Sequence, residues 1–238
     1  FQNTNFLMIS LMKNENKKKL IELENIHVDL KSSFETINVL KGINLKIFKN
    51  ESVGIIGESG AGKSTLVMCI AGLELISKGK IFFKNSPIHN LNEDDLAIYR
   101  SKNIGVIFQA FNLLPSMTAL ENVNLPIEIA GSFKNNKMAI ELLTAVGLKN
   151  RIFHYPHQLS GGEQQRVAIA RSLISNPEIL IADEPTGNLD KRNSEDVIKL
   201  LFKLKKDFGS TLILVTHDTS VAKLCDRIIK IDNGLIAE

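Results

Sequence analysis

The sequence has no tryptophan, only two tyrosines and two cysteines, and no long hydrophobic run. A bilayer-spanning helix needs about 20 consecutive apolar residues, so we do not expect an integral membrane protein. Cys69 and Cys225 lie far apart, which argues against a disulfide framework, and we expect buried free thiols in a reducing cytosol. The net charge is only +3, so charge alone gives no reason to expect nucleic-acid binding.

Residues 1–19 are predicted to form a tail, and residues 20–238 a single domain. In the tail, the apolar stretch Phe6–Met12 precedes a lysine cluster at 13–19, the reverse of the order in a secretory signal. The lysines are expected to be solvated, with contact to lipid headgroups as the alternative. Because the sequence starts at Phe1, we leave open whether residues 1–12 are native.

Short apolar runs alternate with helical segments, which predicts an α/β fold. Three near-continuous apolar runs are typical of parallel strands buried on both faces: Val53–Ile56, Ile179–Ala182 and Leu212–Val215. Between about residues 110 and 177 the pattern becomes helical, which predicts a helical subdomain inserted into the core. The predicted strands are Leu20–Ile26, Asn44–Lys49, Ser52–Gly57, Lys80–Lys84, Ile104–Phe108, Glu178–Ala182, Thr211–Thr216 and Arg227–Ile231. The predicted helices of the insertion are Ala119–Ile129, Asn136–Val146 and Ser160–Ile174.

A glycine-rich segment follows the first buried run: Gly57, Glu58, Ser59, Gly60, Ala61, Gly62, Lys63, Ser64 and Thr65. It matches the phosphate-binding pattern G-x-x-x-x-G-K-[ST] between a strand and a helix, a context that makes a chance glycine-rich turn the weaker alternative. The glycines let main-chain N–H groups surround phosphate oxygens, and the helix start adds positive potential. We expect Lys63 to reach the β- and γ-phosphates and Ser64 to bind Mg²⁺.

Two acidic residues follow the second buried run. Asp183 ends this strand, where an acid of P-loop proteins holds Mg²⁺. Glu184 comes next, where a carboxylate can polarise the attacking water. Alone, the pair is read equally well as two solvated acids before a turn at Pro185; beside the P-loop, the catalytic interpretation is favoured.

A third motif combines a helix cap with two glycines. Ser160 and Glu163 form the capping-box pattern at a helix start. A well-capped helix is the simplest interpretation, but Gly161 and Gly162 are costly in a helix unless main chain must approach something closely. Bare N–H groups at a helix start bind anions, so the motif is predicted to serve a phosphate bound to another subunit.

From about Leu20 to Ala237 the chain resembles ATP-binding cassette (ABC) ATPases, whose signature motif is similar to Leu159–Arg166. The resemblance implies a RecA-like, mostly parallel sheet core, an N-terminal antiparallel β-subdomain and an inserted helical subdomain. It also implies ATP and Mg²⁺ as cofactors. In the family's pattern, Ser160 and Gly162 contact the γ-phosphate of ATP on the opposite copy, and Asp190 faces across the dimer. Gln109 matches the glutamine beside Mg²⁺ and the attacking water, and His217 the histidine at the γ-phosphate.

One position departs from the family's pattern. An aromatic residue usually stacks on adenine, but the alignment places Leu30 there, with Phe34 nearby. Whether Leu30 or Phe34 contacts the base is left open.

The segments Phe108–Pro115 with Thr118–Val123, and Ala182–Asp190, look like the LolD/MacB/FtsE group. Within this group, Leu30, Pro87–Leu91 and Cys225–Arg227 are most similar to the YbbA subgroup. This resemblance implies an ATPase subunit that forms a head-to-tail homodimer and drives a membrane permease of FtsX/MacB type. The apolar segment Ala110–Met117 then lies near the permease, or belongs to the core of the helical subdomain. The implied location is the cytoplasmic face of the bacterial inner membrane, reached only through the permease.

Two other functions are considered. In the first, the cassette is a regulatory ATPase that recruits a cell-envelope or division complex without transport. In the second, it is a soluble nucleic-acid ABC ATPase. About 95 residues separate Thr65 from Ser160, without the sustained heptads of a long coiled coil, and the charge is near neutral, so no nucleic-acid partner is expected.

Overall fold

The computed structural model describes residues 18–31 and 35–237. Of the predicted tail, only Lys18 and Lys19 are among the described residues. Phe34 lies outside them. The strands are β1 Lys19–Lys31, β2 Thr36–Phe48, β3 Ser52–Ile56, β4 Lys78–Phe83, β5 Ser86–Pro87, β6 Ile104–Phe108, β7 Ile179–Asp183, β8 Thr211–Val215, β9 Arg227–Asp232 and β10 Leu235–Ala237. The helices are α2 Lys63–Ala71, α3 Glu93–Asn103, α4 Ala119–Ile129, α5 Asn136–Ala145, α6 Gly161–Leu173, α7 Lys191–Phe208 and α8 Thr219–Ala222, with 3₁₀ turns η1 Lys149–Arg151 and η2 Pro156–Gln158.

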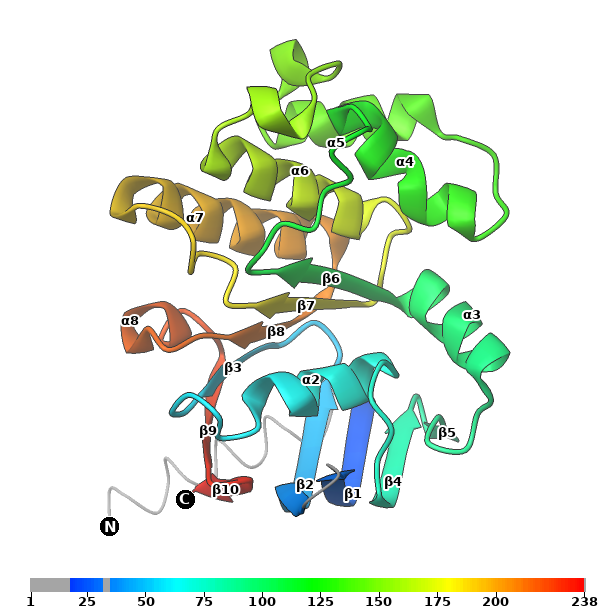
Figure 1. Cartoon of the computed structure of the whole chain (residues 1–238), viewed down its shortest axis with the longest axis vertical. Coiled ribbons are helices and arrows are strands. Elements are labelled where there is room, and N and C mark those ends of the chain that lie inside the picture. The colour runs from blue at the N-terminus through cyan, green and yellow to red at the C-terminus, as the bar shows by residue number, and fades with distance from the viewer. Residues whose placement is uncertain (1–17, 32–34, 238) are drawn as a thin grey trace.

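A six-stranded sheet in the order β10-β9-β3-β8-β7-β6 runs through the middle of the molecule (Figure 1). β9, β3, β8, β7 and β6 are parallel, and β10 pairs antiparallel with β9. A separate antiparallel sheet in the order β2-β1-β4-β5 lies on the side of α2. The predicted α/β fold, with a parallel core and an N-terminal antiparallel sheet, is therefore confirmed.

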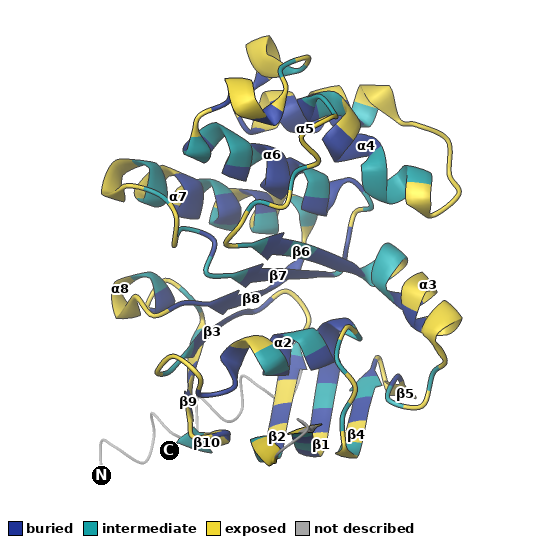
Figure 2. Ribbon diagram, in the orientation of Figure 1, coloured by how far each residue is buried: buried dark blue, intermediate teal, exposed yellow. Residues whose placement is uncertain are grey.

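The central strands β7 and β8 are buried on both faces, as their apolar runs predicted (Figure 2). Alternate residues along each strand enter different cores because successive side chains point to opposite faces. Ile181 and Ile213 pack with α2 and the antiparallel sheet. Leu180 and Leu214 pack with α4, α5, α6 and α7 on the other face.

The helical region between β6 and β7 agrees closely with the sequence pattern. α4 has the predicted bounds, α5 ends one residue early, and Ser160 caps α6 rather than belonging to it. The predicted strand Asn44–Lys49 was too short, because β2 begins at Thr36 and pairs with β1 along its length. Among the residues that the structure describes, the helices α3, α7 and α8 were not predicted.

Both cysteines are free, as expected: Cys69 is buried and Cys225 half-buried. Burial raises the pKa of both thiols to about 12. Within residues 18–31 and 35–237, none of the helices combines the length and apolar character that a bilayer-spanning segment needs.

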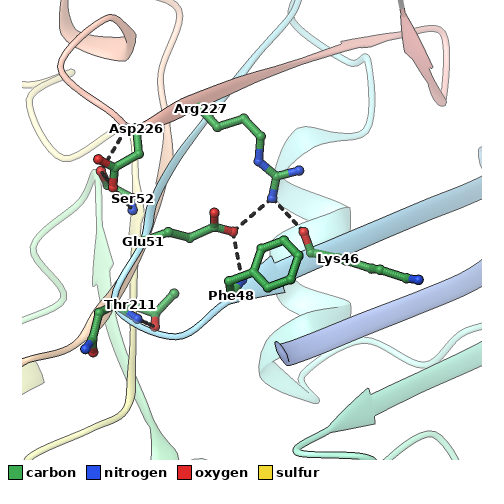
Figure 3. A network of polar contacts seen from close by, with 8 residues as sticks. Lys46, Phe48, Glu51, Ser52, Thr211, Asp226 and Arg227 are labelled. Atoms are coloured by element: carbon green, nitrogen blue, oxygen red, sulfur yellow. Dashed lines mark hydrogen bonds and ion pairs between the residues drawn. The ribbon is translucent and has the colours of Figure 1, made fainter. Parts of the chain in front are cut away.

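A polar network ties the two sheets together (Figure 3). Glu51, only 5% exposed, accepts hydrogen bonds from the main-chain N–H of Phe48 at 2.8 Å and from Arg227 Nη2 at 2.9 Å. The same Arg227 nitrogen donates to the carbonyl of Lys46 at 2.6 Å. Glu51 therefore joins the end of β2 to the start of β9, which keeps the antiparallel sheet and the parallel core in fixed register.

Glu51→Ala is expected to lower the free energy of unfolding by about 2 kcal/mol, because it removes two hydrogen bonds to a buried charged group. Urea unfolding followed by circular dichroism measures this difference. Glu24→Ala, on the exposed part of β1, is the matched control and is expected to change stability by less than about 0.5 kcal/mol. Equal stability losses in the two variants would contradict the role of Glu51.

Candidate nucleotide-binding site

The predicted P-loop connects β3 to α2, and its last glycine starts the helix. Gly62 is the N-cap residue with φ 100°, a left-handed conformation that favours glycine. No side chain caps α2, and its first turn carries no acidic residue. The first N–H groups of the helix are therefore available to an anion, and the helix dipole adds positive potential there.

Lys63 lies across the inside of the loop. Its Nζ donates hydrogen bonds to the carbonyls of Gly57 at 2.9 Å and Glu58 at 2.8 Å. The side chain is 9% exposed and borders the cavity described below. The ammonium group therefore closes the loop from inside and still faces the space where phosphates would lie.

Asp183, at the end of β7, lies beside the P-loop as predicted. Burial raises the pKa of its carboxyl, while a hydrogen bond with Ser64 and the charge of Lys63 act in the opposite direction. One carboxyl oxygen, Oδ1, is buried and has no hydrogen-bond partner within the described part of the chain. A buried oxygen without a partner is costly, so this atom is suited to a ligand that comes from outside the chain.

Glu184 has a strained backbone and a histidine neighbour. Its φ of 48° lies in the left-handed region, which is uncommon for a residue other than glycine and is often found at functional sites. Its main-chain N–H donates to the carbonyl of Val215 at 3.0 Å, which holds the turn against β8. Its Oε2 lies 2.9 Å from Nδ1 of His217, whose ring is largely exposed. The two residues that were predicted to act at the γ-phosphate are thus in direct contact.

A cavity of about 560 Å³ brings most of these residues together. Its lining includes the predicted residues Ser59, Gly60, Gly62, Lys63, Ser64, Thr65, Gln109, Glu184 and His217. Leu30 and Gly187 also border it, together with Val39, which the sequence analysis did not single out. Polar side chains line the P-loop side of the cavity, whereas Leu30 and Val39 are aliphatic. This division suits a ligand with a charged end and an apolar end.

The signature residues form a separate group. Ser160 accepts a hydrogen bond from the N–H of Glu163, and Glu163 accepts one from the N–H of Ser160 at 2.8 Å, so the predicted capping box is present. The hydrogen bond from the Ser160 main-chain N–H, above all, lowers the pKa of the Glu163 carboxyl, and the Ser160 side chain and Arg151 act in the same direction. None of residues 160–163 lines the cavity in the described part of the molecule.

Asp190 lies outside the cavity too. Its side chain caps α7 by accepting a hydrogen bond from the N–H of Asn193. A Cβ atom on Gly162 would lie 2.8 Å from Oδ1 of this same Asn193. A larger residue at position 162 would therefore have to displace the Asn193 side chain at the start of α7, a reason for Gly162 that the sequence analysis did not give.

Gln109 directly follows β6 and makes two contacts that the sequence did not indicate. Its Nε2 donates to Oδ1 of Asn188 at 3.2 Å, and its carbonyl accepts from Nδ2 of Asn188 at 3.0 Å. A third contact links α6 to the turn after Glu184, because Gln165 Nε2 donates to the carbonyl of Pro185 at 2.7 Å. Each of these contacts joins segments that are far apart in sequence.

The comparison with known proteins agrees with this geometry. The sequence pattern of the ABC transporter family matches residues 40–187, more than half of the chain. The ABC transporter ATP-binding protein YbbA of Escherichia coli K12 is 41% identical over 223 residues, which cover 93% of this chain and 98% of YbbA. The chain is an ABC transporter ATP-binding protein.

Other relatives place the cassette in the predicted group. The lipoprotein-releasing system ATP-binding protein LolD of Bacteroides thetaiotaomicron is 45% identical, over 91% of this cassette and 99% of LolD. The macrolide export ATP-binding/permease protein MacB of Bdellovibrio bacteriovorus is 44% identical, over 91% of the cassette but only 33% of MacB.

A solved structure is similar along almost the whole chain. The dimeric cassette MJ0796, in a post-hydrolysis state bound to ADP and Pi, has a TM-score of 0.85 and 41% identity. The match covers 92% of this chain and 97% of MJ0796. The cassette is therefore an ATPase of the LolD/MacB type with the ABC fold, and the predicted ATP binding and ATPase activity are confirmed.

Proposed function

We propose that two copies of the cassette bind two ATP molecules between them, head to tail, and that closure of this dimer drives a membrane permease. The division of the predicted site supports the proposal. The P-loop, Gln109, Glu184 and His217 border one cavity, whereas Ser160–Glu163 and Asp190 lie outside it. Each chain thus carries two half-sites, and a two-fold dimer combines each cavity with the signature residues of the other copy. The similar cassette MJ0796 is dimeric.

In this proposal the P-loop binds the phosphates. The main-chain N–H groups of Gly57–Thr65 and the start of α2 surround them, and Lys63 moves from the carbonyls of Gly57 and Glu58 to the β- and γ-phosphates. Ser160 and the N–H groups of Gly161 and Gly162 from the second copy then contact the γ-phosphate.

Ser64, Asp183 and Gln109 are proposed to hold Mg²⁺. The donor set fits the ion, because hydroxyl, carboxylate and amide oxygens are hard ligands and Asp183 Oδ1 lacks a partner within the described residues. No group of three or more His, Cys, Asp or Glu side chains forms a metal site by itself in residues 18–31 and 35–237. The ion is thus expected to arrive with the nucleotide, and it offsets the charge of the phosphate oxygens when bound.

Glu184 is proposed to orient the attacking water and to accept its proton. His217, 2.9 Å away, restricts the carboxylate to one orientation and is placed to contact the γ-phosphate. Gln109 borders the same cavity and is held there by Asn188. The strained backbone of Glu184 fits this role, because the hydrogen bond from its main-chain N–H to β8 fixes the turn that carries the carboxylate before substrate arrives.

The aliphatic residues Leu30 and Val39 are proposed to contact the base. Leu30→Tyr is expected to tighten ATP binding about tenfold, because stacking of a base on an aromatic ring contributes about 1–3 kcal/mol. Titration with a fluorescent ATP analogue measures the affinity. Leu73→Tyr, at an exposed position after the end of α2 opposite the P-loop, is the matched control and is expected to bind like wild type. Unchanged affinity in Leu30→Tyr would place the base elsewhere.

The permease is proposed to be of the FtsX/MacB type, on the cytoplasmic face of the bacterial inner membrane. The similarity to MacB, named an ATP-binding/permease protein, supports this choice. In the segment Ala110–Met117, Leu113 packs against the core, whereas Leu114 is 40% exposed and directly precedes Pro115. Leu114 is thus the apolar side chain best placed to contact a permease.

Affinity purification from native membranes, followed by mass spectrometry, tests the permease assignment. The variant Glu184→Gln is used because bound ATP then keeps the dimer closed. We expect an FtsX/MacB-type permease to copurify. Leu114→Asp added to this variant is expected to reduce its recovery, whereas Leu235→Asp, an exposed leucine on β10, is not. Recovery of soluble proteins alone would favour the regulatory function, and equal effects of the two aspartates would overturn the role of Leu114.

A further inference from the structure

The main chain directly after Gln109 has an unusual conformation. Phe111 has φ 22° and Asn112 φ 51°, so two successive residues other than glycine lie in or next to the left-handed region. Such values are uncommon, above all for a bulky residue such as phenylalanine, and they persist only where surrounding structure holds them. This turn separates Gln109, in the cavity, from the segment that contains Leu114.

Arg171 holds this turn from the far part of the signature helix. It lies three turns beyond Ser160, and its Nη1 and Nη2 donate to the carbonyls of Asn112 and Phe111, the latter at 2.8 Å. Arg171 makes no ion pair with a carboxylate among the residues that the structure describes. Two donors of one planar guanidinium thus bind two successive main-chain carbonyls, which fixes their relative orientation.

The neighbouring contacts make the turn part of a continuous arrangement. Gln109 is held from one side by its two hydrogen bonds with Asn188. The Phe111 ring lies beside the start of α6, since a Cβ atom on Gly161 would be 3.7 Å from Phe111 Cζ. A shift of the turn would therefore displace Gln109 or its contact with Asn188.

We infer that Arg171 is a positioning residue for ATP hydrolysis: by binding the carbonyls of Phe111 and Asn112, it sets the place of Gln109 in the nucleotide cavity. Arg171 itself does not border the cavity, so it acts through the turn and not on the nucleotide. The inference rests on the proposed role of Gln109. In this inference α6 has two roles. Its start presents the signature residues, and Arg171 near its end fixes the position of Gln109.

Arg171→Lys tests the inference with little change in volume. A lysine donates from a single point and cannot orient two carbonyls as a planar guanidinium does. We expect kcat to fall about tenfold, because small misplacements in an active site cost one to two orders of magnitude in rate. The affinity for a fluorescent ATP analogue and the KM are expected to stay within about twofold, since the P-loop is untouched.

A second substitution separates positioning from a purely structural role. Asn112→Gly, added to Arg171→Lys, lets the main chain adopt φ near 51° without help, since glycine enters the left-handed region freely. We expect kcat to recover at least about threefold, because the turn then forms without the guanidinium. A folded double variant without recovery would overturn the inference.

Arg100→Lys is the matched control, because Arg100 Nη1 also donates to a main-chain carbonyl, that of Gly72 at 2.7 Å, but outside the cavity. We expect a similar change in melting temperature and an unchanged kcat. Wild-type kcat in Arg171→Lys, or an equal loss in Arg100→Lys, would overturn the inference.

Gln109→Ala distinguishes a failure of the proposed role of Gln109 from a failure of the inference about Arg171. If it hydrolyses ATP normally, the proposed role of Gln109 fails; if it is slow while Arg171→Lys is normal, only the inference fails.

Discussion

Replacing Glu184 with glutamine is expected to slow ATP hydrolysis at least ~100-fold while ATP binding is kept. General-base assistance is worth ~10²–10⁴-fold, and an amide cannot accept the proton of the attacking water. The substitution keeps the volume of the side chain, and the amide oxygen can still accept a hydrogen bond from His217, so the strained turn at Glu184 is preserved. Phosphate release under single-turnover conditions measures the rate directly.

The same variant is expected to form a stable dimer with ATP, because the bound nucleotide is no longer consumed. Size-exclusion chromatography with light scattering, with and without ATP, detects this change in mass. Glu178→Gln is the control, because this glutamate precedes β7, pairs with Lys84 and lies outside the cavity. The variant is expected to turn over ATP at the rate of the wild type. Turnover near wild type in Glu184→Gln would refute the assigned role.

The second large effect is expected for Lys63→Ala, which should weaken ATP binding by about 10–100-fold. Hydrogen bonds to charged groups contribute about 1.5–3 kcal/mol, and Lys63 is the cation proposed to meet the phosphates. Its two bonds to P-loop carbonyls are lost as well, so the loop is less well ordered before ATP arrives. Equilibrium dialysis with labelled ATP measures the affinity.

Two comparisons make the Lys63 result specific. Lys84→Ala, an exposed lysine paired with Glu178, removes the same charge far from the cavity and is expected to leave ATP affinity unchanged. The unfolding midpoint of Lys63→Ala reports whether the fold is intact. Undiminished ATP binding in a folded Lys63→Ala protein would be incompatible with the P-loop assignment.

Local sequence signals predicted the features that depend on neighbouring residues. The apolar runs of β3, β7 and β8 indicated strands buried on both faces, and the structure confirms them. The Ser160–Glu163 pattern indicated a capping box, which is present. α7 has a comparable signal, because Val197, Leu201 and Leu204 recur at helical spacing and are buried, so a periodicity count applied to this segment would have found the helix.

Contacts between distant segments could not be predicted in this way. The bonds of Asn188 to Gln109 and of Arg171 to the turn at Phe111 depend on how α6 and the loop after β7 pack against β6. Val39 borders the cavity only because β2 lies against the P-loop. In each case the contact has no local sequence signal, and it follows from the tertiary arrangement alone.

The position of β3 has a consequence for the newly made protein. β3 lies between β8 and β9, which are the last long strands of the chain, whereas β1, β2 and β4 pair within the first 83 residues. A chain still on the ribosome can thus complete the antiparallel sheet early, but the strand leading into the P-loop has neither neighbour until residues 211–232 have emerged. Nucleotide capture therefore has to wait for the synthesis of β8 and β9, and chains that stop before β8 carry the P-loop sequence without both neighbours of β3.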